Sequence, residues 1–341
     1  MEDFGFDVRV AWRRDDPTII ADAIALWARE GLLPDGVDPA ERARELVVAV
    51  YRQGELAALS TAALDRIDFL RARFAILRSA TATAFRRARA QYAVSAASRE
   101  ALRDWSLAHP EEKLAGTISF VERGQWGEAE RRPVWPRPGM ELAGYDQHGR
   151  QIRVHWFDHF RFDSPDGRPP VPVPAVPPEL LLDVELRLAW RLGDPRIEAD
   201  ASAFWTRLGL LPAGVNPADR ANDIVLAVYK GDRMVAVTTA ELGILPQVRA
   251  RLAMIRGAVD PEFRRSHIGA VMLARARATL EAWSAENPDE RVAGLGAIVE
   301  SRELGPRARQ PYAPLSRFGL IGFTPDGRQI RVSWFQDFRL D

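Results

Sequence analysis

Residues 259–273 read VDPEFRRSHIGAVML, and this stretch joins a strand to a helix. Val259 ends an apolar run, Asp260 and Pro261 are typical of a turn, and apolar residues at helical spacing begin at Ile268. The first main-chain N–H groups of a helix have no partner within it, and the helix dipole places partial positive charge there. The junction therefore predicts a site for an anion such as a phosphate or pyrophosphate.

The residue types at this junction fit that prediction. Gly269 is small enough to let an anion approach the main chain, and Arg264 and Arg265 can add charge-assisted hydrogen bonds. The remaining contacts would come from main-chain amides, and the predicted contact segment is Ser266, His267, Ile268, Gly269 and Ala270.

The junction has a counterpart 178 residues earlier, because the chain repeats itself. About two-fifths of the paired positions are identical, and a repeat this long is a domain rather than a short structural unit. Features kept in both halves are interpreted as fold, and features of one half as function. The pairs that establish the offset include Trp12/Trp190, Trp27/Trp205, Tyr51/Tyr229, Phe85/Phe263, Trp105/Trp283 and Trp156/Trp334.

The two junctions differ at one decisive position. Gln91 stands where the second half has Gly269, although Arg86 and Arg87 keep the two arginines. A Gln side chain would occupy the space that a phosphate must enter, so the first half is interpreted as a degenerate copy. The alternative is that Gln91 points away and both halves bind a ligand.

The predicted organisation is two domains with a spacer between them. The stretch SPDGRPPVPVPAVPP is too rich in proline for a helix or a central strand and favours a semi-rigid linker. We therefore expect an N-terminal domain over 1–163, a linker over 164–182 and a C-terminal domain over 183–341.

The second half reads as a mixture of strands and helices. Period-two alternation, apolar residues at helical spacing and turn residues predict the element type in each segment. The order is typical of an α/β or α+β domain with a mixed sheet. The predicted segments are a strand at 184–192, helices at 195–208 and 217–223, strands at 224–229, 234–242 and 248–259, a long helix from 268 past 283, and strands at 292–299, 319–323 and 329–335.

Composition narrows the range of functions. Lys plus Arg equals Asp plus Glu at 47 each, which gives no electrostatic footprint for nucleic acid or an acidic membrane. There is no Cys and no basic-then-apolar leader pattern, so we expect a cytoplasmic protein without disulfides. His148, His155 and His159 are expected on a solvated hairpin face, and no metal site is predicted.

At this point the junction resembles the GNAT-type N-acyltransferase superfamily. That family's pyrophosphate loop has Gln or Arg, two residues, Gly, one residue, then Gly or Ala, and the pattern falls on Arg264, His267 and Gly269. Two features depart from it. His267 stands where the family has Gly. The sequence also shows no helix after the fifth main strand, where the family often has a Tyr that acts as the acid; Tyr312 is the tyrosine of that region.

The resemblance implies two tandem GNAT-like copies, each a central mixed sheet with helices on its faces and one splayed strand pair. Acetyl-CoA or another acyl-CoA would lie between the splayed strands as co-substrate. Its pyrophosphate would lie at the junction and its thioester near the strand 254–259, where the cofactor-binding candidates are Arg256, Gly257, Ala258 and Val259.

Three residues are candidates for catalysis. Glu241 ends the third strand and Glu300 the fifth, where either could accept a proton from an amine. Glu300 pairs with Glu122, which favours a structural role, whereas Glu241 pairs with Ala63 and is the better base candidate. A solvated strand-end carboxylate remains the alternative for Glu241, and Tyr312 is the candidate acid.

The resulting hypothesis is an acyl-CoA-dependent N-acetyltransferase that works through its C-terminal half. Its acceptor would be a small-molecule amine or a peptide amine, with no nucleic-acid or membrane partner. The rival hypothesis is a non-catalytic protein of the same fold that responds to acyl-CoA or binds protein. The sequence leaves open whether the chain forms a homodimer.

Overall fold

A computed structural model describes residues 5–88, 90–122, 127–135, 139–163, 184–211, 214–263, 268–299, 309–314 and 316–340. The chain forms two compact units: unit 1 is Met1–Glu130 with Val134–Arg161, and unit 2 is Arg131–Pro133 with Phe162–Asp341. The linker predicted at 164–182 lies outside the described residues. Each unit is described below by itself.

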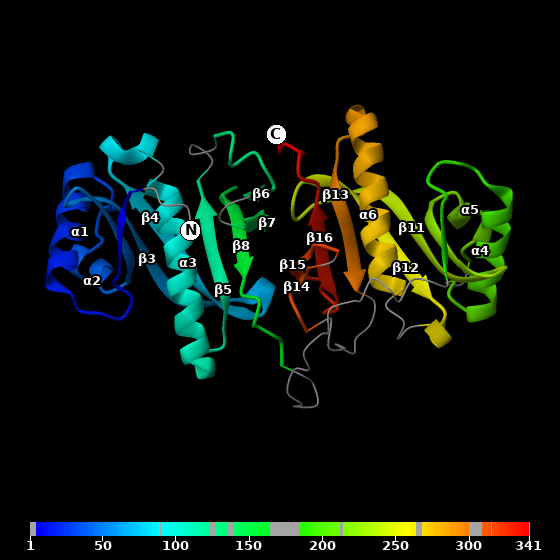
Figure 1. The fold of residues 1–341 in the computed structure, drawn as a ribbon, viewed down its shortest axis with the longest axis horizontal. Coiled ribbons are helices and arrows are strands. Elements are labelled where there is room, and N and C mark those ends of the chain that lie inside the picture. Colours follow the sequence, from blue (N-terminus) through cyan, green and yellow to red (C-terminus); the bar gives the residue numbers. More distant parts are fainter. Residues whose placement is uncertain are drawn as a thin grey trace. The chain divides into compact units, whose positions relative to one another are not determined.

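Unit 1 contains one eight-stranded sheet with the strand order β1-β2-β3-β4-β5-β8-β7-β6 (Figure 1). β4 and β5 are parallel neighbours, and the other neighbouring strands run antiparallel. The elements are β1 (Asp7–Val10), α1 (Pro17–Glu30), α2 (Pro39–Ala43), β2 (Leu46–Arg52), β3 (Glu55–Ile67), β4 (Ala72–Thr81), α3 (Ala90–Ala108), β5 (Leu114–Val121), β6 (Val134–Trp135), β7 (Met140–Tyr145) and β8 (Gln151–Trp156).

Unit 2 repeats this order as β9-β10-β11-β12-β13-β16-β15-β14, with β12 and β13 as the parallel pair. The mixed α/β sheet predicted for each half is therefore confirmed. The elements are β9 (Glu185–Leu188), α4 (Pro195–Leu208), α5 (Pro217–Ala221), β10 (Ile224–Lys230), β11 (Arg233–Leu245), β12 (Ala250–Val259), α6 (Ile268–Glu286), β13 (Val292–Val299), β14 (Tyr312–Ala313), β15 (Phe318–Phe323) and β16 (Gln329–Trp334).

Local sequence signals explain where α4 begins and ends. The Asp194 carboxylate accepts hydrogen bonds from the N–H groups of Arg196 and Ile197 at 2.9 and 3.3 Å, which satisfies two of the unpaired donors at the helix start. Pro195 occupies the first turn, and Gly209 ends the helix with φ 62°. In unit 1, α1 begins and ends in the same way, with Asp16 at its N-cap and Gly31 at its C-cap.

The preceding strand is shorter than predicted. The alternating pattern predicted a strand over 184–192, but β9 ends at Leu188. The chain turns there, because the Leu192 N–H donates to the Ala189 carbonyl at 3.1 Å and Arg191 has φ 58°. A non-glycine residue with positive φ leaves little trace in the sequence, so the alternation alone overestimated the strand.

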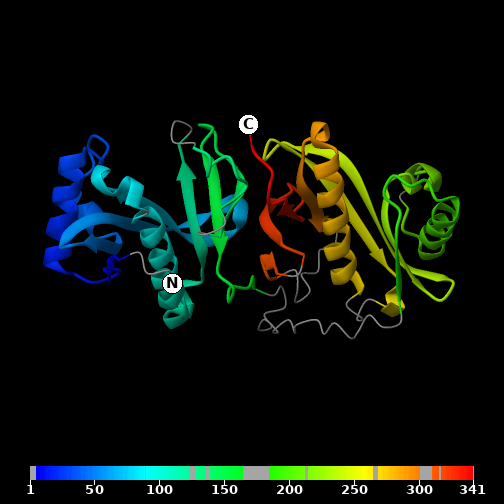
Figure 2. The ribbon, with the colours of Figure 1, turned by 45° about the horizontal axis from the view of Figure 1, so that its top comes forward.

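Helices cover both faces of the unit 2 sheet. On one face α4 buries Ile197, Ala201, Phe204 and Trp205 against strand residues that include Val237. On the other face α6 buries its predicted apolar stripe, with Met272 packed on Ala236 and Ala276 packed among Ala240, Ala253 and Ile255. Figures 1 and 2 show strands of the sheet between α6 and α4 in both views. Successive side chains of a strand point to opposite faces of the sheet, so alternate residues of each strand face the α4 side and the α6 side.

A serine near the end of the long helix ties that helix to the following strand in both units. In unit 1 the Ser106 hydroxyl donates to the Leu114 carbonyl at 3.1 Å, and in unit 2 the Ser284 hydroxyl donates to the Val292 carbonyl at 3.0 Å. Because both copies make this bond, it belongs to the fold.

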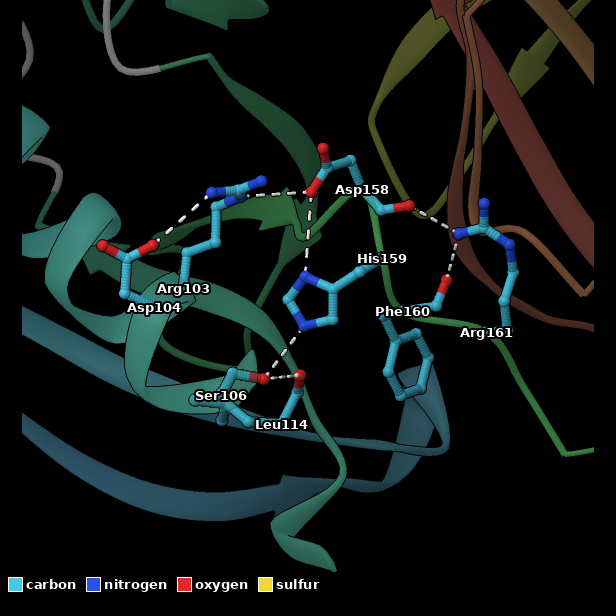
Figure 3. Close-up of polar contacts among 8 residues, drawn as sticks. All are labelled: Arg103, Asp104, Ser106, Leu114, Asp158, His159, Phe160 and Arg161. Atoms are coloured by element: carbon cyan, nitrogen blue, oxygen red, sulfur yellow. Dashed lines mark hydrogen bonds and ion pairs between the residues drawn. The ribbon is translucent and has the colours of Figure 1, made fainter. Parts of the chain in front are cut away.

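Unit 1 adds a histidine and a carboxylate to this tie. His159 Nε2 lies 3.1 Å from the Ser106 hydroxyl, and His159 Nδ1 lies 3.7 Å from an Asp158 carboxylate oxygen (Figure 3). The order Ser, His, Asp resembles a hydrolytic triad, but Ser106 is 4% exposed and its proton is directed at a main-chain carbonyl. A nucleophile must reach its substrate and give its proton to the histidine, so we interpret this grouping as structural.

The two histidines of this region do not lie where the sequence placed them. The prediction of a solvated hairpin face is wrong for both, because His155 on β8 is partly buried with Nδ1 3.0 Å from the Gly139 carbonyl, and His159 lies beyond β8 against Ser106. Burial lowers the pKa of both rings. For His159 the Asp158 carboxylate opposes this shift while Arg103 and Arg161 add to it; for His155 the Gly139 carbonyl opposes it while Arg99 adds to it.

These shifts predict an acid-sensitive unit 1. The unfolded histidines take up protons near their ordinary pKa of 6.5, and the folded ones do so at lower pH. Their contribution to stability is therefore present above pH 6.5 and is lost as the pH falls below it. Hydrogen exchange from about pH 7.5 to about pH 5.5, corrected for intrinsic exchange, should show that unit 1 loses more protection in the parent than in a variant without the two histidines. The variant is the reference because burial raises the pKa of Glu141 in unit 1 to about 8, and that carboxyl group stabilises the fold as the pH falls.

The control uses the repeat. Unit 2 has Ser333 and Asp337 at the matching positions, so it should lack this response, and His155→Ser with His159→Asn should flatten it in unit 1. A histidine variant whose unit 1 responds to this pH change as the parent does contradicts the argument.

Candidate functional site

The two parallel strands at the centre of unit 2 pair over only part of their length. The register of β12 with β13 runs from Arg251–Val292 to Met254–Gly296. Beyond that point β12 continues to Val259 beside β11, and β13 continues to Val299 beside β16. Because each strand stays with its outer neighbour, the two separate from each other. We call residues 255–259 and 297–299 the fork, and it matches the splayed strand pair expected from the sequence.

Unit 1 has the same fork, but a side chain bridges it. The register of β4 with β5 ends at Ile76–Ile118, and immediately beyond it the Ser119 hydroxyl donates to the Leu77 carbonyl at 3.1 Å. The matching residues of unit 2 are Ala297 and Ile255. Alanine has no hydroxyl, so this bridge cannot form in unit 2, and the main-chain carbonyl of Ile255 keeps its capacity to accept a hydrogen bond from a ligand.

The cofactor-binding residues predicted on β12 all lie at the fork. Ile255 packs on the α6 side of the sheet and Ala258 on the α4 side. Because side chains alternate along a strand, Gly257 lies on the α6 side and Arg256 on the α4 side. A Cβ atom at Gly257 would lie 3.1 Å from the Met272 methyl group, so a side chain there would press on α6. Glycine thus keeps the main chain of the fork accessible beneath the helix.

The end of β12 lies directly against the beginning of α6. A Cβ atom added to Gly269 would lie 3.6 Å from a Val259 methyl group, which is ordinary van der Waals contact. Ile268, Gly269 and Ala270 therefore form the first turn of α6 beside the fork, as predicted. The other loop candidates lie outside the described residues: Arg264, Arg265, Ser266 and His267.

A buried carboxylate holds the turn that leads into this loop. Asp260 is 2% exposed, and its Oδ2 accepts hydrogen bonds from Arg207 at 2.9 Å and from Arg233 at 2.7 Å. Its Oδ1 accepts from the Glu262 N–H at 3.1 Å. Burial alone would raise the pKa of Asp260, but these hydrogen bonds hold that pKa below its usual value. Unit 1 has Ala82 at this position, so the anchor is specific to unit 2.

Glu241 lies level with the opening of the fork. It is paired across β11 and β12 with Met254, the last β12 residue in register with β13. Thr239, two residues earlier on the same face, is paired with Arg256, so the Glu241 and Arg256 side chains are diagonal neighbours on the α4 face. Both side chains are exposed. A carboxylate here can accept a proton from an amine held at the fork.

Asp223 is a further charged residue at this place, and the sequence argument missed it. Its main-chain carbonyl accepts from the Ala240 N–H at 2.9 Å, which places it beside Glu241. Burial raises the pKa of Asp223, Glu241 adds to that rise, and Arg191 opposes it. Its counterpart in unit 1 is Glu45, so a systematic comparison of the repeats would have found it.

The remaining two catalytic candidates receive no support from position. Glu300 lies outside the described residues; its counterpart Glu122 is exposed and lies 3.5 Å from Arg150. Tyr312 lies on β14, which is separated from β13 by β16 and β15. With strands about 4.8 Å apart, three strand spacings put Tyr312 roughly 14 Å from the fork. The structure therefore does not bring Tyr312 to the site.

The described residues also bear on metal sites and on membrane-spanning helices. Among these residues, no three His, Asp or Glu side chains are grouped as metal ligands would be. Within the same ranges, none of the helices combines the length and apolar character needed to cross a bilayer.

No protein-family model matches the chain, and no curated protein matches its sequence. Solved structures do match it. An acetyltransferase of the GNAT family from Streptococcus pneumoniae is 12% identical over 44% of this chain and 96% of its own, with a TM-score of 0.30. The ribosomal-protein-S18-alanine N-acetyltransferase from Escherichia coli is 18% identical over 44% and 90%, with a TM-score of 0.26.

Some matches cover most of the chain. A GCN5-related N-acetyltransferase from Sphaerobacter thermophilus is 14% identical over 82% of this chain and 83% of its own, with a TM-score of 0.27. All three of these structures are named as acetyltransferases. The two mixed sheets of this chain have the same strand order as each other.

Proposed function

We propose that the chain is an acyl-CoA-dependent N-acyltransferase that transfers an acetyl group to an amine and works through unit 2. The observation that carries the proposal is the unbridged fork, which opens beside the first turn of α6. The main chain of β12 would hold the pantetheine and thioester. The amides of the α6 start, with Arg264 and Arg265, would hold the pyrophosphate, because a helix N-terminus attracts anions.

Glu241 is the proposed general base. The amine nitrogen forms a bond to the acyl carbon, the carbon–sulfur bond breaks, and the thiolate leaves with the electron pair of that bond. Glu241 takes the proton that the nitrogen loses, directly or through one water molecule. Main-chain N–H groups at the fork would polarise the thioester carbonyl. The thiolate takes a proton from solvent, since Tyr312 lies on a distant strand.

A non-catalytic protein of the same fold is the second candidate. Two observations favour it: His267 occupies a glycine position of the loop pattern, and Tyr312 does not lie at the fork. Such a protein would bind acyl-CoA at the same place without turnover. The binding and turnover experiments below separate the two candidates.

Gly269→Gln should weaken acetyl-CoA binding. The variant imitates Gln91, and its Cβ makes only ordinary contact with Val259, so unit 2 should fold normally. The longer side chain would block the approach of a phosphate to the helix start. We expect the Kd for acetyl-CoA, measured by calorimetry on the full chain, to rise at least about tenfold. Gln91→Gly is the matched control and should change nothing; an unaltered Kd in Gly269→Gln would place the site elsewhere.

Ala297→Ser should close the fork of unit 2. The new hydroxyl would reach the Ile255 carbonyl as Ser119 reaches Leu77, and it would occupy an acceptor that a bound pantetheine needs. We expect acetyl-CoA affinity to fall by about tenfold, the effect of one lost hydrogen bond in a dry site. Ser119→Ala in unit 1 is the control and should leave affinity unchanged. If Ala297→Ser binds as tightly as the parent, the open fork is not the binding site.

Glu241→Gln should slow catalysis without affecting binding. Removal of a general base lowers kcat by about 10²–10⁴-fold, and the acidic limb of the pH–rate profile should disappear with it. The Kd for acetyl-CoA should stay within error, because the carboxylate lies on the α4 face, away from the α6 start. Glu122→Gln serves as the control carboxylate. Unchanged turnover in Glu241→Gln would remove this residue from the mechanism.

A further inference from the structure

Two arginines beside the fork do not make the ion pairs that their counterparts in unit 1 make with a shared carboxylate. In unit 1 the Glu45 carboxylate accepts from Arg42 at 2.7 Å and from Arg78 at 3.3 Å, so one side chain satisfies both cations. The matching trio in unit 2 is Arg220, Asp223 and Arg256.

Asp223 is one methylene shorter than Glu45 and does not replace that pairing. Among the described residues, no ion pair joins Asp223 to either arginine. The Arg220 Nε is buried and has no hydrogen-bond acceptor within the described ranges, and the guanidinium lies 5.1 Å from the centre of the Trp205 ring. Burial lowers the pKa of Arg220, and the positive charge of Arg256 lowers it further. Neither guanidinium is paired with Asp223, so both can donate charge-assisted hydrogen bonds to a carboxylate of a ligand.

This arginine pair lies next to the proposed base. Arg256 is a fork residue, and Glu241 is its diagonal neighbour on the same face, at a distance of roughly 7–8 Å by sheet geometry. Unit 1 has Ala63 in place of Glu241. Compared with unit 1, unit 2 therefore has an additional carboxylate near the fork and an arginine pair without the shared ion pairs, and both differences fall on one face of the sheet.

A pocket opens beside the same face. It has a volume of about 440 Å³ and is lined by residues that include Arg191, Ile197, Asn222 and Ile224. Ile224 is paired with Thr239, which is paired with Arg256, so the pocket and the arginine pair lie along one row across the sheet. Its lining residue Ile224 lies two strand spacings, roughly 10 Å, from Arg256, so an extended molecule held at Arg256 would point toward the pocket.

We propose that Arg220 and Arg256 bind a carboxylate of the acceptor, and that the acceptor is a free amino acid or a close analogue. This inference rests on the proposed function. The guanidinium groups would hold the carboxylate, since arginine matches its planar geometry. The acceptor nitrogen would lose one proton to solvent and attack the thioester as the neutral amine, and Glu241 would take the second proton as the nitrogen bonds to the acyl carbon. The side chain of the acceptor would extend toward the pocket.

The test uses the full chain and matched pairs of probes. The twenty proteinogenic L-amino acids and their α-carboxamides are supplied as acceptors with acetyl-CoA, and release of the CoA thiol is measured. Binding of each amino acid is also measured by calorimetry without acetyl-CoA. We expect at least one amino acid to bind and to be acetylated with kcat/KM about tenfold or more above that of its amide.

Asp223→Glu tests whether the arginine pair causes the preference for amino acids over their amides. The variant restores the internal carboxylate of unit 1, so the KM and Kd for the amino acid should rise about tenfold while the amide is unaffected. The KM for acetyl-CoA should not change. Glu45→Asp, the reverse exchange in unit 1, is the matched control and should alter neither value.

The outcomes distinguish this inference from the proposed function. Equal turnover of acids and amides overturns the carboxylate site and leaves the acetyltransferase proposal intact. A preference for acids that persists in Asp223→Glu overturns the assignment to the arginine pair. Amino-acid binding that is lost in Asp223→Glu, without turnover of any amine, supports the carboxylate site and contradicts the enzyme. Absence of both binding and turnover contradicts both.

Discussion

The partial pairing of β12 with β13 is the constraint on which the site depends. Parallel neighbours need a crossover connection, and α6 supplies it by running from the end of β12 back to the start of β13 (Figure 1). The helix must therefore begin where β12 ends. Since the strands pair at their N-terminal ends and are held apart by β11 and β16 further on, the fork opens at the edge where α6 begins. One topological requirement thus brings unpaired strand main chain and a helix N-terminus together.

The chain contains this arrangement of fork and helix start twice, once in each unit, and the two copies differ at the fork. The packing is shared: Trp12 meets Trp105 edge to face at 5.6 Å between ring centres, and Trp190 meets Trp283 in the same way at 5.5 Å. The differences gather at the fork and at its margins. Unit 1 bridges its strands and neutralises its arginines, whereas unit 2 does neither and adds a carboxylate. The exchanges are Ser119 to Ala297, Glu45 to Asp223, Ala63 to Glu241 and Gln91 to Gly269.

Sequence reasoning recovered the elements where local chemistry sets them. The helix over 195–208 and the strand over 292–299 were predicted to the residue, because a capping Asp194, Gly209 and an uninterrupted apolar run mark their limits. The point where two strands part is set by tertiary packing, so the last pair, Met254–Gly296, has no local signal. The burial of His155 likewise depends on a distant carbonyl and was predicted wrongly. The hydrogen bond of Ser119 has no local sequence signal either. Only a position-by-position comparison of the two copies draws attention to Ser119, because Ala297 replaces it in unit 2.

The number of acetyl-CoA molecules bound by one chain tests the account most directly. Calorimetric titration of the full chain, with hydrogen exchange in the presence and absence of acetyl-CoA to locate the site, measures both the number and the place. The account predicts one molecule per chain, with new protection confined to β12 and the first turn of α6. Two equivalent molecules per chain, or protection that appears at β4 and the start of α3, would contradict the division between an open and a bridged fork.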